Sequence, residues 1–445
     1  MKVTLTSFRC IRPAEPTWNG IMPLSESDQT GVITHVPTIY FYRPGSDVDI
    51  PLILTASLSR ALVYFYPLAG RLRRLPRGRL ELDCNGEGVS FVEAECGNDM
   101  DELGEFGASS PEFESLIPKV DYCSGDVVEF PLLLVQVTKF RCGGACLSLA
   151  ISHAVVDGQS SLHFISEWAR LARGELIQHL PILDRKLLRA GEKSSATQSA
   201  FRHKQFDPPP LIVGEIDAEN ERKKPTAVAM LRISRSQVRT LKLAANDGRR
   251  DFTRYEALTA HVWRSACRAR ALRDEQPTNL AICVEIRRRV SPNLPAKFFG
   301  NAIVDVIASS SSGELTGNPL GFAAGKVKEA IESVTGEYVD SVIDYLKNLE
   351  DLAAVQDVGG RRREKKEEGP FYGNPNIGVI SWMGLPLYGL DFGWGKEIYM
   401  GPGTHDSDGD SLILPAPDSD GDLVVAICLQ VECMDAFKNF FYQDI

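Results

Sequence analysis

The sequence predicts a mixed α/β fold of layered sheets and helices, divided into two domains. The chain has 445 residues, more than one hydrophobic core ordinarily serves, so two domains of roughly 200 residues each are expected. Strand-like apolar runs alternate with helical patterns on both sides of residues 191–226. That central stretch holds three consecutive prolines and a charged run, a composition typical of a linker that cannot order itself. The predicted domains are therefore 1–190 and 227–445, joined by a linker or crossover at 191–226.

The composition is that of a soluble globular protein. Its hydrophobic fraction is 43% and its charged fraction 24%. A net charge of −10 argues against a nucleic-acid partner. No apolar run approaches the roughly 18 residues that span a bilayer, and the N-terminus lacks the apolar core of a signal peptide, so no membrane association is expected. Ten scattered cysteines without a secretion signal indicate reduced thiols and a cytoplasmic location.

The first half carries strands and helices in alternation. Apolar runs predict buried strands at 36–42, 130–139 and 145–152, and a turn joins the last two as a pair. Residues 57–68 have a helical pattern, and a second helix is predicted from just after Gly158 to near residue 174.

A hairpin is predicted between these elements. Residues 77–84 and 88–93 have strand-like alternation and flank Asn85-Gly86, a dipeptide that favours tight hairpin turns. We therefore expect these two strands to pair with each other.

The second half repeats the mixed pattern. A strand is predicted at 226–233, and a helix opens at Thr253. Near the C-terminus, residues 412–414 and 423–429 read as the two strands of a hairpin joined by Asp- and Gly-rich residues.

One histidine stands at a junction between elements. His153 follows the predicted strand 145–152, and Asp157 and Gly158 precede the next helix. Active sites commonly lie at such junctions, and Gly158 permits a tight exit from the turn. Asp157 is well placed to fold back and hold the loop. From this pattern alone, both a catalytic base and a structural histidine remain open.

A second motif changes that balance. Asp391-Phe-Gly-Trp-Gly395 follows Ile380-Ser-Trp382, and its two glycines around Trp394 predict a turn with unusual backbone angles. In this order, His153-x-x-x-Asp157 and Asp391-Phe-Gly-Trp-Gly395 resemble the BAHD acyltransferases of plants. The resemblance covers essentially the whole chain.

Within that family the chain most resembles the spermidine hydroxycinnamoyltransferases. The stretches that carry this narrower resemblance are 152–160, 166–174, 369–375 and 401–410. The shikimate and quinate hydroxycinnamoyltransferases are close relatives that share the two main motifs.

The resemblance implies a fold and a mechanism. It implies two chloramphenicol-acetyltransferase-like domains with a solvent channel at their interface and His153 midway along it. His153 would act as general base while the acceptor attacks the acyl-CoA thioester directly in a ternary complex. Acyl-CoA is then a co-substrate, no cofactor is bound permanently, no metal motif is present, and the chain is expected to be a monomer.

The resemblance also assigns roles to individual residues. Trp382 would donate its indole N–H to the tetrahedral oxygen, and Asp157 would form a structural salt bridge with Arg287. The residues expected to shape the floor of the coenzyme channel are Asp391, Gly393, Trp394 and Gly395. Those expected to contact the coenzyme are Thr253, Arg254 and Tyr255, although Thr253 could equally serve only as a helix cap.

The acceptor is predicted from charge. Shikimate-type relatives carry an Arg in the loop before Trp382, where this chain has Glu368. Acidic groups attract an amine and repel a carboxylate, so spermidine is the predicted acceptor and hydroxycinnamoyl-CoA the donor. The residues predicted to bind the acceptor are His35, Glu368, Asp406, Asp408 and Asp410.

Other interpretations remain open at this point. The Asp-rich run could be a plain turn. An O-acyltransferase for shikimate or quinate would need a cation for the acceptor's carboxylate, and Arg361 to Arg363 are candidates. A ligand-binding descendant without catalysis is the third interpretation, which the presence of His153, Asp157 and Trp382 disfavours.

Overall fold

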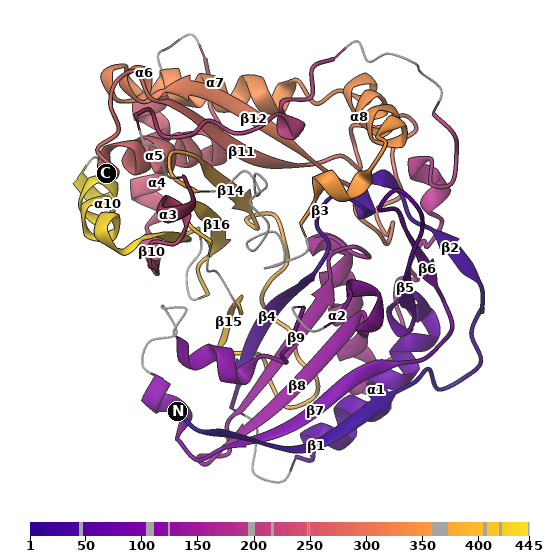
Figure 1. The fold of residues 1–445 in the computed structure, drawn as a ribbon. Helices are drawn as coiled ribbons and strands as arrows, with labels where there is room; N and C mark the ends of the chain where they lie inside the picture. Colours follow the sequence, from indigo (N-terminus) through magenta and orange to yellow (C-terminus); the bar gives the residue numbers. More distant parts are fainter. Residues whose placement is uncertain are drawn as a thin grey trace.

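The computed structural model describes residues 1–43, 48–103, 111–122, 125–194, 201–214, 218–246, 248, 250–357, 373–403, 407–417, 421–443 and 445. It contains two large six-stranded sheets, one in each half of the chain, with helices against each of them (Figure 1). The predicted mixed α/β fold class is confirmed.

The first sheet combines strands of the N-terminal half with one strand from far along the chain. Its order is β1 (Val3–Ile11), β7 (Val89–Cys96), β8 (Leu133–Phe140), β9 (Ala145–Ser152), β4 (His35–Tyr42) and β15 (Tyr399–Pro402). The predicted pairing of 130–139 with 145–152 is confirmed by the antiparallel β8 and β9. Every residue of β9 is buried, so the strand that ends at His153 is held from both faces.

Helices α1 (Ile50–Tyr64) and α2 (Gly158–Ala172) pack on this sheet and on each other (Figure 1). The indole N–H of Trp168 on α2 donates to the Ser57 hydroxyl on α1 at 2.9 Å. Both side chains are buried. The core of the first half therefore lies between its sheet and this helix pair.

The second sheet has the order β10 (Thr226–Ile233), β17 (Leu423–Gln430), β16 (Asp410–Pro415), β14 (Ile377–Ser381), β11 (Pro277–Glu285) and β12 (Ile303–Ser311). The predicted strands 412–414 and 423–429 pair antiparallel as part of it. The helices of this half are α4 (Arg235–Ala245), α5 (Arg254–Ala269), α6 (Ser312–Gly317), α7 (Leu320–Glu332), α8 (Gly336–Asn348) and α10 (Val431–Gln443). Helix α5 packs against α4, α7 and α10, and its fully buried Trp263 donates to the Thr278 hydroxyl of β11 at 3.1 Å.

Smaller elements complete the fold. A three-stranded sheet contains β2 (Ile21–Pro23), β6 (Leu80–Asp83) and β5 (Arg71–Arg74), and β3 (Gly31–Val32) pairs with β13 (Gln356–Asp357). The short helices are η1 (Glu26–Asp28), η2 (Tyr66–Ala69), η3 (Met100–Leu103), η4 (Pro111–Leu116), η5 (Val127–Glu129), η6 (Arg185–Leu188), η7 (Lys204–Phe206), α3 (Ala218–Arg222) and η8 (Leu352–Val355).

The predicted hairpin at Asn85-Gly86 is wrong. Strand β6 pairs with β2 and β5, whereas β7 pairs with β1 and β8 in the large sheet. The Gly86 φ of 67° matches the tight turn that the dipeptide indicated. The chain therefore passes here from one sheet into another, and the apolar residues of both strands enter the same core.

The predicted linker is more ordered than expected. Of residues 191–226, the structure describes 191–194, 201–214 and 218–226. His203 is buried against Tyr338 and Tyr345, and Phe206 stacks on Tyr345 with ring centroids 5.1 Å apart. These aromatic side chains provide the apolar burial that the overall composition of the stretch did not suggest.

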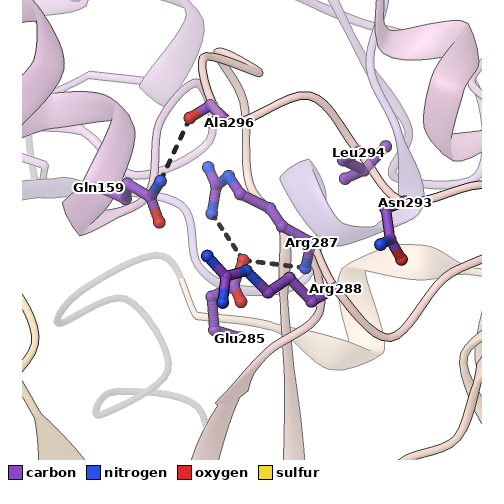
Figure 2. A pocket seen from close by; sticks show the side chains of 7 residues that line it. All are labelled: Gln159, Glu285, Arg287, Arg288, Asn293, Leu294 and Ala296. Carbon is purple, nitrogen blue, oxygen red and sulfur yellow. Dashed lines mark hydrogen bonds and ion pairs between the residues drawn. The ribbon is translucent and has the colours of Figure 1, made fainter.

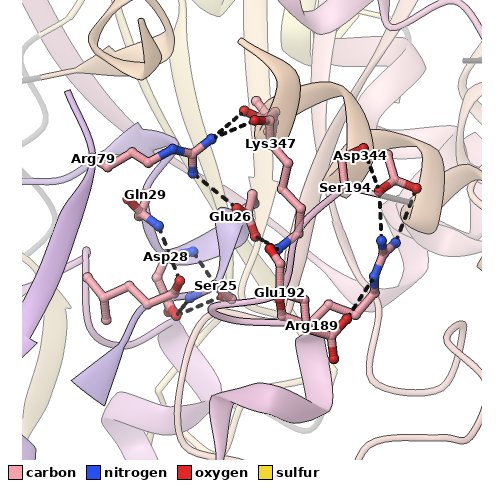
Figure 3. A network of polar contacts seen from close by, with 12 residues as sticks. Ser25, Glu26, Asp28, Gln29, Arg79, Arg189, Glu192, Ser194, Asp344 and Lys347 are labelled. Atoms are coloured by element: carbon pink, nitrogen blue, oxygen red, sulfur yellow. Dashed lines mark hydrogen bonds and ion pairs between the residues drawn. The ribbon is translucent and has the colours of Figure 1, made fainter. Parts of the chain in front are cut away.

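A buried polar network fastens α8 to the N-terminal half (Figure 3). Glu26 of η1 pairs with Lys347 of α8 at 3.3 Å, and both side chains are 4% exposed. Arg79 contacts Glu26 at 3.2 Å and also donates to the backbone oxygen of Lys347 at 3.0 Å. Removing one member of such a buried pair strands the other charge, so the network favours a single arrangement of the two halves.

Among the residues described, no helix is both long and apolar enough to cross a membrane.

Candidate active site

The turn that carries His153 is held by its backbone from both halves of the molecule. The His153 N–H donates to the Thr34 oxygen at 2.8 Å, which fixes the turn to the residue directly before β4. On the other side, Asn301 Nδ2 donates to the His153 oxygen at 2.7 Å. Asn301 lies just before β12 of the second sheet. His153 therefore stands where the two halves meet.

Asp157 connects the same turn to the second half through a buried ion pair. It caps α2 by accepting the Ser160 N–H at 2.8 Å. Its two oxygens lie 3.0 and 2.8 Å from Arg287, and the two side chains are 3% and 4% exposed. It also accepts the Ala302 N–H at 3.0 Å. Arg287 is the partner that the resemblance implied.

A second buried ion pair, which no sequence pattern predicts, supports the turn. Asp28 and Arg185 are fully buried and 3.1 Å apart. Asp28 accepts the backbone N–H and the Nδ2 of Asn301, while Arg185 donates to the Val155 oxygen at 2.7 Å. The residues come from four distant parts of the chain, so no local pattern predicts their meeting.

The side chains of His153 and Trp382 are left available. Neither the imidazole of His153 nor the indole N–H of Trp382 has a hydrogen-bond partner within the described ranges, and both side chains are half-buried. Trp382 directly follows β14, and its backbone N–H donates to the Ile413 oxygen at 2.9 Å. A fixed backbone with an unused polar side chain is what proton transfer and oxyanion stabilisation require.

The Asp391–Gly395 motif crosses to the N-terminal core. Asp391 Oδ1 accepts the N–H groups of Gly393 and Gly395 at 2.7 and 3.0 Å, and the two glycines have φ of 111° and 103°. Phe392 is fully buried and meets Trp168 of α2 with ring centroids 5.0 Å apart. The motif thus shapes its own loop. Its role at the floor of a coenzyme channel stays a prediction.

A cavity of about 360 Å³ lies beside the Asp157–Arg287 pair (Figure 2). Its lining residues are Gln159, Glu285, Arg287, Arg288, Asn293, Leu294 and Ala296. Gln159 belongs to the first turn of α2 and donates to the Ala296 oxygen at 3.3 Å across the junction. Arg287 is occupied by Asp157 and Glu285, whereas Arg288 is exposed and has no ion-pair partner among the residues described.

The predicted acceptor contact of His35 is corrected by the structure. Its Nε2 lies 2.7 Å from the Pro131 oxygen, and its Nδ1 is hydrogen-bonded to the Tyr122 hydroxyl. Burial lowers the pKa of His35 to about 4, so the ring is neutral at pH 7. Both ring nitrogens are occupied by protein groups. His35 is therefore a packed structural histidine.

The structure describes two of the four acidic residues predicted to bind the acceptor, Asp408 and Asp410. Asp408 pairs with the buried Arg270 at 3.0 Å and accepts the N–H groups of Asn374 and Gln430. Asp410 is the first residue of β16 and pairs with Gly378 of β14. Gly378 lies four residues before Trp382, which corresponds to roughly 13 Å along a strand. Asp408 is thus structural, and Asp410 lies at the end of the sheet away from Trp382. The predicted residues Glu368 and Asp406 lie outside the described residues.

The three predicted coenzyme contacts lie together at the start of α5. Thr253 caps this helix by accepting the Glu256 N–H at 3.1 Å, and the Glu256 carboxylate accepts the Thr253 N–H in return. The Tyr255 hydroxyl donates to the Val379 oxygen at 2.9 Å. The capping role of Thr253 is therefore filled. Arg254 is exposed, and its contact with the coenzyme stays a prediction.

Comparison with known proteins decides the family. Residues 1–444 match the sequence model of the Transferase family. The chain belongs to this family. The resemblance to the BAHD acyltransferases is confirmed at that level, and the chain is an acyltransferase that uses a coenzyme A thioester.

Individual members of the Transferase family are similar over their whole length. The hydroxycinnamoyl-CoA:piscidic acid hydroxycinnamoyltransferase of Actaea racemosa is 40% identical over 100% of both chains. The shikimate O-hydroxycinnamoyltransferase of Nicotiana tabacum is 39% identical over 99% of this chain and 100% of its own. The crystal structure of vinorine synthase shares the fold, with a TM-score of 0.75 at 21% identity over 100% and 98% of the two chains. Neither hydroxycinnamoyltransferase is named for spermidine, so the narrower resemblance is not confirmed.

Proposed function

We propose that this transferase moves a hydroxycinnamoyl group from its coenzyme A thioester to a hydroxyl group of a small hydroxy acid such as shikimate or quinate. The observation that carries the proposal is the state of His153. Its backbone is fixed from both halves, while its imidazole has no protein partner among the described residues. The similar hydroxycinnamoyltransferases support the acyl group and the class of acceptor.

The mechanism follows from the groups present. His153 takes the proton of the acceptor hydroxyl while its oxygen attacks the thioester carbonyl carbon. The negative charge that develops on the carbonyl oxygen receives a hydrogen bond from the indole N–H of Trp382. The carbon–sulfur bond then breaks, and the departing coenzyme thiolate takes the proton back from His153. Ester and free coenzyme A are the products.

A covalent acyl-enzyme is not needed. The thiol of Cys283 lies near the carboxylates of Asp157 and Asp305 and is the nucleophile to consider. Burial first, and then these carboxylates, raise the pKa of Cys283 well above its ordinary value, so it remains a protonated and weak nucleophile. Direct transfer between the two bound substrates is therefore the favoured route.

Spermidine, the acceptor first predicted, has lost part of its support. Asp408 is occupied by Arg270, and His35 is occupied by Tyr122 and Pro131. A hydroxy acid instead needs a cation for its carboxylate, and Arg288 in the cavity beside Asp157–Arg287 is the cation that we propose for it.

The direct test supplies the purified chain with p-coumaroyl-CoA and, in parallel, shikimate, quinate and spermidine. Products are identified by mass. We expect esters of the hydroxy acids, and a rate that falls by about 10²–10⁴-fold in His153→Ala. His179→Gln is the matched control, because the His179 side chain is 45% exposed and contacts Glu167 of α2 rather than the turn that carries His153. Amide from spermidine without any ester would replace the proposed acceptor, and full activity in His153→Ala would remove the proposed base.

A further inference from the structure

A second cavity, of about 580 Å³, lies beside β12, the last strand in the order of the second sheet. Residues 306–309 of β12 line this β12 cavity together with residues of α7, of the start of α8 and of the segment 201–205 (Figure 1). Its volume falls within the range of small-molecule sites, roughly 300–1,000 Å³. Among the residues described, none lines both the β12 cavity and the cavity beside the Asp157–Arg287 pair. The two cavities are therefore distinct.

One wall of the β12 cavity is held in place by α8. The Tyr338 hydroxyl donates to Gln205 Oε1 at 2.9 Å, and the Tyr338 ring meets the Phe201 ring edge-on, with centroids 5.5 Å apart. In the same segment, His203 Nε2 lies 3.1 Å from the Ser341 hydroxyl of α8. These contacts fix the segment against the helix, so the cavity is formed before any ligand binds.

The floor of the β12 cavity is apolar. Val306, Ile307 and Ala308 are buried, and the half-buried Ala330 of α7 also lines it. A ligand gains affinity by covering these carbon atoms, so it needs an apolar body. An aromatic ring gains further, because it can also contact the Phe201 ring.

Two lysines line the β12 cavity from different elements, Lys204 from η7 and Lys326 from α7. Neither has an ion-pair partner within the part of the chain that the structure describes. The other charged lining residues, Arg202 and Glu329, are each engaged in an ion pair with a residue outside the cavity. Two cations without a counter-charge at one cavity attract an anion.

The surroundings of the lysines favour a carboxylate over a phosphate. Phosphates commonly bind the free N–H groups at a helix N-terminus. The helix that begins at this cavity is α8, and its first turn is already capped, because the Thr335 hydroxyl accepts the Tyr338 N–H at 3.2 Å. Arg202, which could grip a phosphate with two nitrogen atoms, already donates from two nitrogen atoms to Asp207.

We propose that the β12 cavity binds a small aromatic carboxylate, with its ring on the apolar floor and its carboxylate between Lys204 and Lys326. The inference goes beyond the proposed function and does not depend on it, because it concerns binding at a cavity distinct from the one beside Asp157–Arg287. Its test measures binding without turnover.

The test titrates p-coumarate into the wild-type chain and follows binding by calorimetry. We expect a Kd in the millimolar range or below. Lys326→Gln should raise this Kd about fivefold and the double variant Lys204→Gln/Lys326→Gln about 25-fold, because each lysine contributes as a partly exposed ion pair. No binding of p-coumarate below about 10 mM would overturn the inference.

Lys328→Gln is the matched control. Lys328 lies on the same helix, α7, but is paired with Glu332 at 2.9 Å and is not among the described residues that line the cavity. Its variant should bind p-coumarate with the wild-type Kd. Equal Kd values in the wild type and in all three lysine variants would place p-coumarate elsewhere, such as beside His153, and would overturn the inference.

Ser333→Phe blocks the β12 cavity without removing a charge. Ser333 lines the cavity where α7 ends and is exposed, so a phenyl ring at this position fills the cavity rather than the core. We expect binding of p-coumarate to be lost, and thermal unfolding is measured alongside. A variant that unfolds at the wild-type temperature and binds p-coumarate as tightly as the wild type would contradict the proposed site.

Three further probes test the class of ligand. Methyl p-coumarate keeps the ring and lacks the charge, whereas acetate keeps the charge and lacks the ring. Both should bind at least about tenfold more weakly than p-coumarate. Equal binding of the ester would remove the role of the lysines, and equal binding of acetate would remove that of the floor. Either result, or tighter binding of inorganic phosphate than of p-coumarate, would overturn the assignment of an aromatic carboxylate.

Discussion

At the scale of single residues, the site separates groups that hold from groups that react. Asp157, Arg287 and Asn301 are buried and form hydrogen bonds with buried side chains and with the backbone. Within the part of the chain that the structure describes, the imidazole of His153 and the indole N–H of Trp382 have no hydrogen-bond partner. The buried residues, here called the rigid set, thus position His153 and Trp382, the reactive set. Substitutions in the rigid set should mainly lower stability, whereas those in the reactive set should mainly lower activity.

Arg287→Ala tests the rigid set. The substitution leaves the Asp157 carboxylate buried without its cation, and we expect the free energy of unfolding to fall by about 3–5 kcal/mol. Urea unfolding followed by tryptophan fluorescence measures it. Arg288→Ala removes the neighbouring exposed arginine and should cost less than about 0.5 kcal/mol. Equal losses in the two variants would show that the buried pair has no special role.

His35 predicts a dependence of stability on pH. Its folded pKa of about 4 lies below its ordinary value of 6.5, so its contribution is complete above pH 6.5 and is lost as the pH falls toward 4. Between pH 7 and pH 5 this amounts to about 2 kcal/mol. Glutamine at position 35 cannot take up the proton. Between pH 7 and pH 5, the free energy of unfolding of His35→Gln should therefore fall by about 2 kcal/mol less than that of the wild type. Parallel pH profiles of the two proteins would contradict the assignment.

At the scale of elements, the loop from Trp382 to β15 links the sheets. It leaves β14 of the second sheet, buries Phe392 in the N-terminal core and then pairs β15 with β4. The two glycines around Trp394 permit this path, because their φ of 111° and 103° are strained for any residue with a Cβ.

Gly393→Ala isolates that strain. An added Cβ would meet only the Arg173 side chain at 3.8 Å, so there is space for it and the cost is in the backbone. We expect a loss of about 1–3 kcal/mol in the free energy of unfolding. The control is Gly384→Ala in the same loop, where no positive φ occurs and nothing lies within 4 Å of the new Cβ. If Gly384→Ala destabilised as much, the loop path would not depend on the left-handed backbone.

The sequence predicted the elements whose signals are local. The β8–β9 pair, helix α2 and the turn at His153 follow from apolar runs and from Gly158. Asp408 was misassigned because its partner, Arg270, is 138 residues away, and no local pattern distinguishes a paired carboxylate from a free one.

At the scale of the whole molecule, the two halves share a core. Side chains from the second half that enter the N-terminal core are Phe299, Leu387, Phe392, Met400, Leu412, Leu414 and Ala426. The predicted boundaries at 190 and 227 therefore do not divide the chain into two independent bodies, since β15 belongs to the first sheet. Sequence alone could not show this, because β15 is four residues long and its pairing is non-local.

A fragment of residues 1–190 tests this shared core. Without β15 and the entering side chains, its core has unfilled space, and we expect a loosely packed state that binds a hydrophobic dye and lacks near-UV circular dichroism. Co-expression with residues 191–445 is the control and should restore both signals. A fragment that unfolds cooperatively with native-like near-UV signals would show that the first half is self-sufficient.

The β4–β15 pairing also sets an order of events during synthesis. Phe41 of β4 can pair with Tyr399 only after about 360 further residues have been synthesised. At about 5–20 residues per second, this synthesis takes on the order of 20–70 s. During that time the outer edge of β4 has unpaired backbone groups next to apolar side chains, a combination that invites association with other chains. The nascent protein therefore has a long interval in which a chaperone can bind that edge, and the ribosome must nearly finish the chain before the first sheet can close.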